Sequence, residues 1–553
     1  MIKVNSPKQC DILIVGGGTA GLMAAVAAAE RGARVIVAEK ADTRRSGGGA
    51  TGNDHFACYI PGYHESVDSY MHELEQGMCK GADPRVQRVF AERSFEIVKD
   101  WEKWGINMRP FGDEYVFEGH TLPGHPRCFL KIDGRDQKKC LTNQARRCGV
   151  MIDNRTSVTR YISREGRVVG AIAIDISRPE PEITLYEAKS IISVTGTGAR
   201  VYPAVAPSCL FNVANCPAGT GTGRVASYEI GAVMVNFDKP RAHIGPRYFV
   251  RGGKGTWIGA CCDAGGNAVG IAGRPEPGEQ DITTDICHEV FDLSKKNGTG
   301  PVFMDCTENP KDTMEHMKEC FYSEGISSLL DAMEQQDIHL EEDMIEWGRY
   351  LPHIQYSGTC INEKCETSTP GLYSAGDECG NFFCGVSGAA VTGRIAGESA
   401  SEYIKGVESF TDIAEAPEVL EAQRFYSSLM EREEGSHWEE LNHAVQNIMR
   451  DYASIETPRS ETLLSCGVSY LEELNQIARR RIKCANSHEL MRTLEAFDIL
   501  ALGRLILLSA LARKESRGLH KRVDYPYTNP LWNSLSMTIK KMNGKDYTEM
   551  QKL

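Results

Sequence analysis

A chain of 553 residues is longer than one hydrophobic core usually serves, so we expect roughly two to four structural units. Its 41% apolar and 25% charged residues exclude a disordered or fibrous protein. The net charge of −13 makes nucleic acid or an anionic membrane an unfavourable partner, although a local basic pocket for a small anion is compatible with it.

The N-terminal residues and the most apolar segment of the sequence argue against secretion and against a membrane span. Residues 1–8 lack an apolar stretch, and the most apolar segment, 499–511, is shorter than the roughly 20 residues that span a bilayer. We therefore expect a cytoplasmic protein, free or attached to a membrane through a partner. The 19 cysteines fit a reducing, anaerobic cytosol in which thiols stay free.

The first predicted strand, residues 11–15, leads directly into a glycine-rich turn, which reads Gly16-Gly17-Gly18-Thr19-Ala20-Gly21 and opens an alanine-rich helix over 22–30. Gly16 permits the tight turn, and Gly18 lets backbone amides approach a pyrophosphate. Gly21 allows the helix to pack closely on the strand. This pattern predicts a dinucleotide site.

A second predicted strand, residues 33–38, ends in Glu39, about twenty residues after the turn. A carboxylate at this position can accept hydrogen bonds from ribose hydroxyls. The segment from Arg45 to Asn53 then consists mostly of small residues, and such a loop can run along a flavin ring. The combination favours FAD over NAD.

Two later segments resemble signatures of the two-dinucleotide-binding flavoproteins. A strand over 190–194 ends in Thr195-Gly196-Thr197-Gly198, and residues 370–377 read Pro-Gly-Leu-Tyr-Ser-Ala-Gly-Asp. The resemblance implies that Asp377 hydrogen-bonds the ribityl chain. It also implies a helix, beginning near Ser387, whose N-terminus faces the flavin pyrimidine ring and stabilises negative charge on it.

The predicted FAD contacts come from the glycine turn, the loop after Glu39 and the later signatures. They are Gly16, Gly18, Ala20, Gly21, Glu39, Lys40, Ser46, Gly47, Gly48, Asn53, Thr195, Gly196, Asp377, Ser387, Ala389 and Ala390.

A C-terminal motif extends the resemblance over nearly the whole chain. Residues 515–526 are similar to the Glu-Ser-Arg-Gly-x-His-x-Arg-x-Asp-x-Pro signature of the succinate dehydrogenase and fumarate reductase flavoprotein superfamily. The family implies an α/β fold with a Rossmann-like FAD-binding domain, an inserted α+β capping domain and a C-terminal helical domain. The implied boundaries are 1–235 with 350–405, then 236–349, 406–505 and a final segment 506–553.

Some family features are missing. Gly47 stands where dicarboxylate-handling members have the histidine that links covalently to the flavin, so we expect non-covalent FAD. The segments 236–240 and 280–285 lack the histidine and the proton-donating arginine that dicarboxylate chemistry needs. A fumarate or succinate enzyme is therefore the alternative, not the expectation.

The chain resembles the alpha subunit of adenylylsulfate reductase more closely, through Ser387–Arg394 and Asn53. That resemblance implies that Arg247 meets an anionic substrate beside the flavin. The aromatic-rich element that sandwiches the nucleotide in that enzyme is replaced here by residues 216–221, which lack aromatic side chains. His353 and Tyr356 are the candidate proton donors, with ordinary packing as the alternative for each.

Four late cysteines, Cys360, Cys365, Cys379 and Cys384, flank the Asp377 motif at regular spacing. Buried free thiols, a redox-active thiol pair and a metal site are all open alternatives, but the spacing is not the short one common in metal sites. We predict no metal in this chain.

Together these features predict an FAD-dependent oxidoreductase acting on a small anionic or thioester substrate. The family implies a flavoprotein subunit that exchanges electrons with an iron–sulfur subunit. The alternatives are a stand-alone fumarate-type reductase and a non-catalytic electron-relay subunit.

Overall fold

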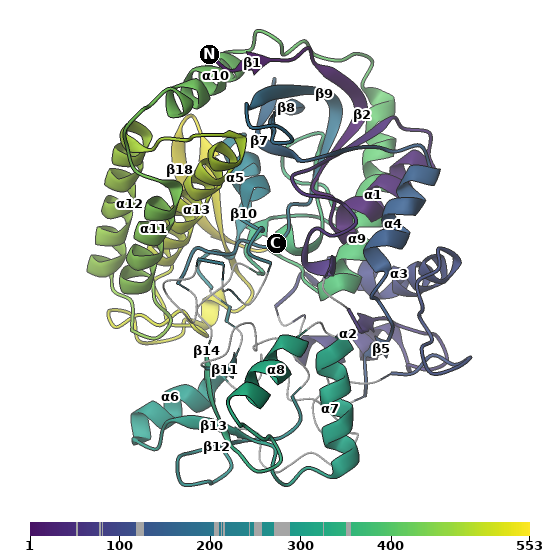
Figure 1. The fold of residues 1–553 in the computed structure, drawn as a ribbon, viewed down its shortest axis with the longest axis vertical. Coiled ribbons are helices and arrows are strands. Elements are labelled where there is room, and N and C mark those ends of the chain that lie inside the picture. Colours follow the sequence, from purple (N-terminus) through teal and green to yellow (C-terminus); the bar gives the residue numbers. More distant parts are fainter. Residues whose placement is uncertain are drawn as a thin grey trace.

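The structure, a computed structural model, consists of three packed units (Figure 1). The inserted second unit has a hydrophobic core of its own, whereas the helical third unit shares one core with part of the first unit's sheet. It describes residues 1–50, 53–76, 79, 81–117, 126–203, 210–211, 213, 216–239, 241–242, 244–247, 257–269, 288–323, 326–349 and 355–553. Within these ranges, no helix combines the length and apolarity that crossing a membrane would require.

The first unit is built on a mixed sheet. Its strands are β1 (Lys3–Val4), β2 (Lys8–Val15), β3 (Val35–Glu39), β6 (Met151–Asn154), β7 (Thr156–Arg164), β8 (Arg167–Asp175), β9 (Glu182–Ser193) and β16 (Leu372–Ser374). The order is β6-β3-β2-β9-β8-β7, and β1 and β16 pair with β9 off this path. The pairings of β9 with β2 and β16 are parallel, and β7 and β8 form an antiparallel arm. The glycine turn follows β2, so it lies at the carboxyl edge of parallel strands, where such sheets bind ligands.

Helices cover this sheet, and residues far apart in the chain meet there. The helical elements of this unit are α1 (Thr19–Ala29), η1 (Gly48–Ala50), α2 (Val67–Gln76), α3 (Pro84–Lys103), α4 (Gln137–Arg147), α5 (Thr222–Glu229), η2 (Gly376–Glu378), α9 (Gly385–Tyr403) and η3 (Ile404–Gly406). α1 and α9 lie side by side (Figure 1). A Cβ at Gly393 would lie 2.3 Å from the Ala20 carbonyl oxygen, and one at Gly397 would lie 2.3 Å from that of Ala24. Small residues therefore allow α9 to approach the glycine-turn helix.

The second unit is inserted between the two parts of the first. It contains β11 (Ile244–Pro246), β12 (Ala260–Cys262), α6 (His288–Asn297), β13 (Val302–Asp305), α7 (Lys311–Ser323), α8 (Ser327–Gln335) and β14 (Ile345–Arg349). Its antiparallel sheet has the order β11-β14-β13-β12, with Trp257 and Trp347 packed edge to face in the core. The first unit also contains a short antiparallel ribbon, formed by β4 (His55–Ala57) and β5 (Phe129–Lys131).

The third unit is a helical layer with a small sheet. Its elements are α10 (Pro417–Met430), α11 (Trp438–Tyr452), α12 (Glu461–Arg481), α13 (Ser487–Ala512), η4 (Pro530–Trp532), β17 (Ser536–Met542) and β18 (Lys545–Gln551). β17 pairs with β10 (Met234–Val235), which pairs with β15 (Gly358–Thr359), so the end of the chain joins the strands that flank the insertion. The predicted fold class is confirmed; the residue boundaries of the domains stay a prediction.

Candidate functional site

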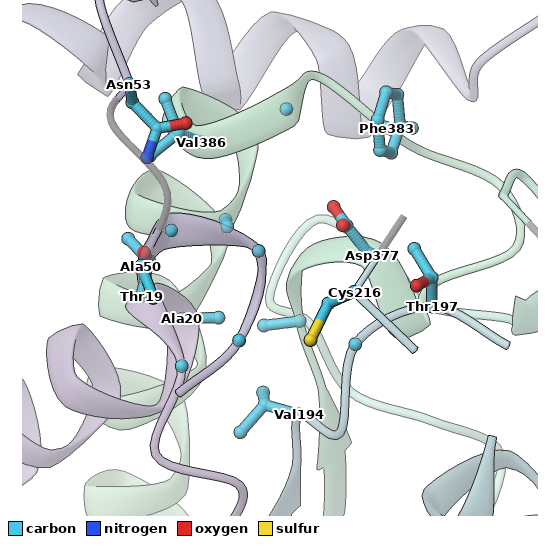
Figure 2. Close-up of a pocket in the computed structure, with 18 of the residues that line it drawn as sticks. Thr19, Ala20, Ala50, Asn53, Val194, Thr197, Cys216, Asp377, Phe383 and Val386 are labelled. Carbon is cyan, nitrogen blue, oxygen red and sulfur yellow. The ribbon is translucent and has the colours of Figure 1, made fainter. Parts of the chain in front are cut away.

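A cavity of about 350 Å³ opens at the carboxyl edge of the sheet. Its walls come from the glycine turn, the loop before β4, the residues after β9, the start of α9, and Ile326 of the inserted unit. Figure 2 shows Asp377 and Phe383 across the cavity from Ala20. Half of the predicted FAD contacts line it: Gly18, Ala20, Gly47, Gly48, Asn53, Gly196, Asp377 and Ala389.

The glycine turn has the geometry that a dinucleotide needs. Gly16 adopts a φ of +109°, and a Cβ at Gly21 would lie only 1.9 Å from the Gly16 carbonyl oxygen. A Cβ at Gly18, in contrast, would meet no protein atom within 4 Å. α1 has no side-chain cap, so its first amides are available to a phosphate.

Glu39 stiffens this turn from the end of β3. Its carboxylate accepts hydrogen bonds from the amides of Gly17 at 2.6 Å and Ala41 at 2.8 Å. Lys138, on α4, donates a hydrogen bond to the Gly17 carbonyl. Burial lowers the pKa of Lys138 to about 8. Lys138 was not predicted, because its sequence position on an ordinary helix carries no local signal.

The loop after Glu39 offers buried polar groups to a ligand. The hydroxyls of Ser46 and Thr43 are buried and have no hydrogen-bond partner among the described residues. Unpaired buried hydroxyls are costly, which fits a loop completed by a bound cofactor. The neighbouring Gly47 has a φ of +77° and no side chain, so it provides no atom for a covalent flavin link.

Two buried side chains fix the residues at the far end of the cavity. The Glu378 carboxylate accepts from the Thr195 amide at 2.5 Å and from its hydroxyl at 2.8 Å. Arg224 donates to the Gly196 and Asp377 carbonyls. Thr195 is thus bonded to Glu378 and is not part of the cavity lining. The backbone of Asp377 is held by Arg224, which the sequence analysis did not identify.

α9 begins at this end of the cavity. Cys384 occupies its N-cap position, without a side-chain cap, and Gly385 and Val386 line the cavity. Ser387 donates to the Cys384 carbonyl at 2.8 Å, and both Ser387 and Ala390 are buried behind the lining. The helix N-terminus therefore faces the cavity, and these two predicted contacts support it from behind.

Two of the three candidate catalytic residues are described, and their surroundings differ. Tyr356 is buried with a φ of +55°, its ring centroid lies 4.9 Å from that of Phe383, and its hydroxyl donates to the Phe383 carbonyl at 3.4 Å. A non-glycine residue in this conformation is strained, and such strain concentrates at functional sites. Arg247 instead pairs with Glu346 at 2.7 Å, is 58% exposed and does not line the cavity. His353 lies outside the described residues.

Arg241 was not predicted, although the structure places it beside Tyr356. Its guanidinium carbon lies 3.9 Å from the centroid of the Tyr356 ring. Lys239, two residues earlier, has its pKa lowered by burial. Lys239 lies within residues 236–240, the segment in which the sequence analysis sought a histidine, and Arg241 follows it directly, so these two basic residues were the available signal.

Lys40 connects the cofactor unit to α13. Its ammonium is 2.5 Å from the Glu495 carboxylate, which also pairs with Arg200 and Arg492. Burial alone would raise the pKa of Glu495, but these three cations lower it to about 2. Lys40 thus lies in a buried ion-pair cluster beside the cavity residues 216 and 217, not in the cavity wall.

Asp498, one turn further along α13, makes stability depend on pH. Burial raises the pKa of this carboxyl from 3.8 to about 7, and it accepts a hydrogen bond from Thr222 at 2.5 Å. The folded protein therefore holds this proton more tightly than the unfolded chain does, so its stabilisation is complete below pH ~4 and is lost as the pH rises through about 7. We expect the melting temperature of Asp498→Asn, measured against the unchanged protein across this range, to fall less as the pH rises. If the melting temperatures of the two proteins fell equally with pH, that result would contradict the raised pKa of Asp498.

Within the described residues, no group of three or more His, Cys, Asp or Glu side chains is arranged to hold a metal ion. The geometry of the glycine turn, the uncapped start of α1 and the unpaired buried hydroxyls is what a dinucleotide-binding site requires.

Comparison with known proteins identifies the class. The family described as FAD binding domain matches residues 11–391, and the family described as fumarate reductase flavoprotein C-term matches 442–552. The chain therefore belongs to the FAD-binding domain family, as an FAD-dependent oxidoreductase of the fumarate reductase and succinate dehydrogenase type. Its cofactor is FAD, held without a covalent link. The predicted family, cofactor and enzyme class are confirmed.

Several relatives span almost the whole chain. One of them, a component of the CoM/CoB fumarate reductase of Methanothermobacter marburgensis, is 24% identical over 97% of this chain and 98% of its own length. L-aspartate oxidase of Vibrio cholerae is 23% identical over 94% and 96%. Among solved structures, adenylylsulfate reductase of Archaeoglobus fulgidus has a TM-score of 0.84 at 21% identity, covering 100% of this chain and 97% of its own. E. coli quinol fumarate reductase has a TM-score of 0.80 at 18% identity, covering 99% and 97%. These likenesses establish the shared fold.

Proposed function

We propose that this chain is the catalytic flavoprotein subunit of an electron-transfer complex and that it oxidises or reduces a small anionic or thioester substrate. The observation that carries the proposal is the arrangement of Arg241 on the strained Tyr356, which packs against the cavity residue Phe383. A cation and a proton donor thus lie beside the end of the cavity at which α9 begins.

The bound FAD would supply two-electron chemistry at this position. Arg241 would hold the anionic group of the substrate, with Lys239 adding positive charge to the same segment. Tyr356 would give a proton to the substrate or take one from it. Arg247, on the inserted unit, and His353 stay candidates for these two roles.

The proposed electron partner is an iron–sulfur subunit. The names of several relatives, such as fumarate reductase flavoprotein subunit, designate components of larger assemblies, which supports a subunit role. We propose that the chain works in the cytoplasm, alone or held at a membrane by that partner. The dicarboxylate reading has support from the relatives' names, but this chain lacks the corresponding histidine and arginine in its sequence.

Anion binding distinguishes the two arginines. In anaerobically purified holoprotein, we expect Arg241→Gln to weaken the binding of sulfite, sulfate or fumarate, followed by the flavin absorbance, on the order of 10- to 100-fold. Arg247→Gln is the matched control and should bind these probes as the unchanged protein does. If only Arg247→Gln loses binding, the anion site lies on the inserted unit instead.

The same preparation tests the proton donor. Tyr356→Phe should keep the probe affinity while slowing turnover of the substrate that the screen identifies, on the order of 100-fold. Fumarate turnover by the purified chain without any co-purifying protein would favour the stand-alone reductase, whereas a holoprotein that binds none of the probes would favour the electron-relay alternative.

A further inference from the structure

Two cysteines from distant parts of the chain meet behind the start of α9. The side chain of Cys79 is hydrogen-bonded to that of Cys384, and the Cys79 thiol also lies 3.3 Å from the Phe383 carbonyl oxygen. Both thiols are buried, with exposed fractions of 0% and 2%. Two thiols within hydrogen-bonding reach of each other are the starting arrangement for a disulfide.

This pair differs from the pairs that the cysteine spacing suggested. The Cys365 thiol donates to the Thr392 carbonyl at 3.4 Å, and that of Cys379 contacts the Ser374 hydroxyl at 3.9 Å. Cys384 therefore faces Cys79 rather than Cys379, its partner in the regular spacing. The contact joins positions separated by about 300 residues.

The position of Cys384 is unusual for a structural thiol. It is the N-cap of α9, where the helix dipole favours a thiolate, and reactive cysteines are often found at helix N-termini. The residues on both sides of it, Phe383 and Gly385, line the cavity. Gly388 leaves room for the cysteine, because a Cβ there would lie 2.9 Å from the Cys384 Cβ.

The surroundings of the pair include a buried tyrosine and a positive charge. The Tyr70 ring is buried beside the pair, and its hydroxyl donates to the Cys128 carbonyl at 3.1 Å. The hydrogen bond to Cys384, together with burial, raises the pKa of the Cys79 thiol well above its usual value, while the charge of Arg241 acts in the opposite direction. Its place at the helix N-terminus makes Cys384 the better candidate for the attacking sulfur.

We propose that Cys79 and Cys384 are a redox-active pair that exchanges two electrons with the bound FAD. In the oxidising direction, a sulfur–sulfur bond forms, two S–H bonds break, and two protons leave while FAD accepts the electron pair. In the reverse direction, the disulfide takes up two electrons from the flavin and two protons, and it opens to two thiols. The pair gives this chain a second two-electron store that is independent of the identity of its substrate.

The holoprotein as purified can be tested directly. After oxidation with ferricyanide and removal of the oxidant, denatured protein should show two fewer thiols than the 19 cysteines of the sequence. Peptide mapping should find the Cys79–Cys384 link. A reductive titration should take about four electrons per FAD, two for each centre. Cys79→Ser and Cys384→Ser should each take about two, whereas the matched control Cys365→Ser, also buried, should take about four.

Electron exchange with FAD needs its own measurement. Light with EDTA reduces protein-bound flavin, so it should open the disulfide in the holoprotein and leave it intact in FAD-stripped protein. FAD content and circular dichroism identify a variant that has lost its fold. The proposal is overturned if oxidised protein keeps 19 thiols, if the link maps to another pair such as Cys128–Cys384, or if light opens the disulfide equally without FAD.

Discussion

Gly18→Ala is expected to bind FAD on the order of 100-fold more weakly, a loss of about 3 kcal/mol, while its apoprotein stays folded. The added methyl group meets no protein atom within 4 Å, so the fold can accommodate it. It would, however, occupy the space in which a pyrophosphate approaches the amides of α1. FAD affinity from flavin fluorescence and the apoprotein melting temperature test the two parts separately.

The matched control is Gly406→Ala, where the new methyl group also meets nothing within 4 Å but no ligand is expected. Gly406→Ala should change neither quantity. Unchanged FAD affinity in Gly18→Ala would mean that the pyrophosphate does not pass over this residue, and an unfolded apoprotein would mean that the turn itself needs glycine there.

Asp238→Ala is expected to reduce the free energy of unfolding by about 3–5 kcal/mol. Asp238 pairs with Arg513, and the side chains of both are fully buried. Arg513 also pairs with Glu515. Without Asp238, a buried guanidinium would share its one remaining carboxylate with Arg517, and an uncompensated buried charge is strongly destabilising.

A surface ion pair provides the control for that measurement. Lys311 and Glu315 are one helical turn apart, and their side chains are 92% and 67% exposed, so Glu315→Ala should cost less than about 0.5 kcal/mol. Urea unfolding of both variants measures the two losses in the free energy of unfolding. Equal midpoints would show that the buried pair contributes no more than the exposed one.

The same network explains the C-terminal motif that the sequence analysis recognised. His520 accepts a hydrogen bond from Arg459 at its Nδ1, at 3.0 Å, and its Nε2 donates to the Arg513 carbonyl at 3.2 Å. Burial lowers the pKa of His520 well below its usual value, so it is neutral and holds the arginines in place. The motif therefore joins the end of the chain to the segment after β10.

Features of the cofactor site that depend on a local sequence pattern were predictable. The turn from Gly16 to Gly21 and the carboxylate of Glu39 follow from fixed spacing around two strands, and the structure places them together. The helix was expected over 22–30 and is observed as Thr19–Ala29, because uncapped helix starts are poorly marked in sequence.

Contacts made through the tertiary fold were not predictable in this way. Arg241 and Tyr356 meet only because strands on either side of an inserted unit pair with one another. Cys79 and Cys384, or Lys40 and Glu495, are hundreds of residues apart, and neither periodicity nor spacing relates them. The family resemblance indicated Arg247, whose exposed side chain pairs with Glu346, and its role stays a prediction.

The late addition of β16 and α9 also determines when the cofactor unit can mature on the ribosome. About 180 residues separate the end of β9 from β16, which at ~5–20 residues per second corresponds to on the order of 10–40 s of synthesis. During that interval the alanine- and glycine-rich face of α1 has no α9 to cover it. The nascent chain therefore presents an uncovered apolar face to chaperones, and flavin loading must wait until the inserted unit has been made.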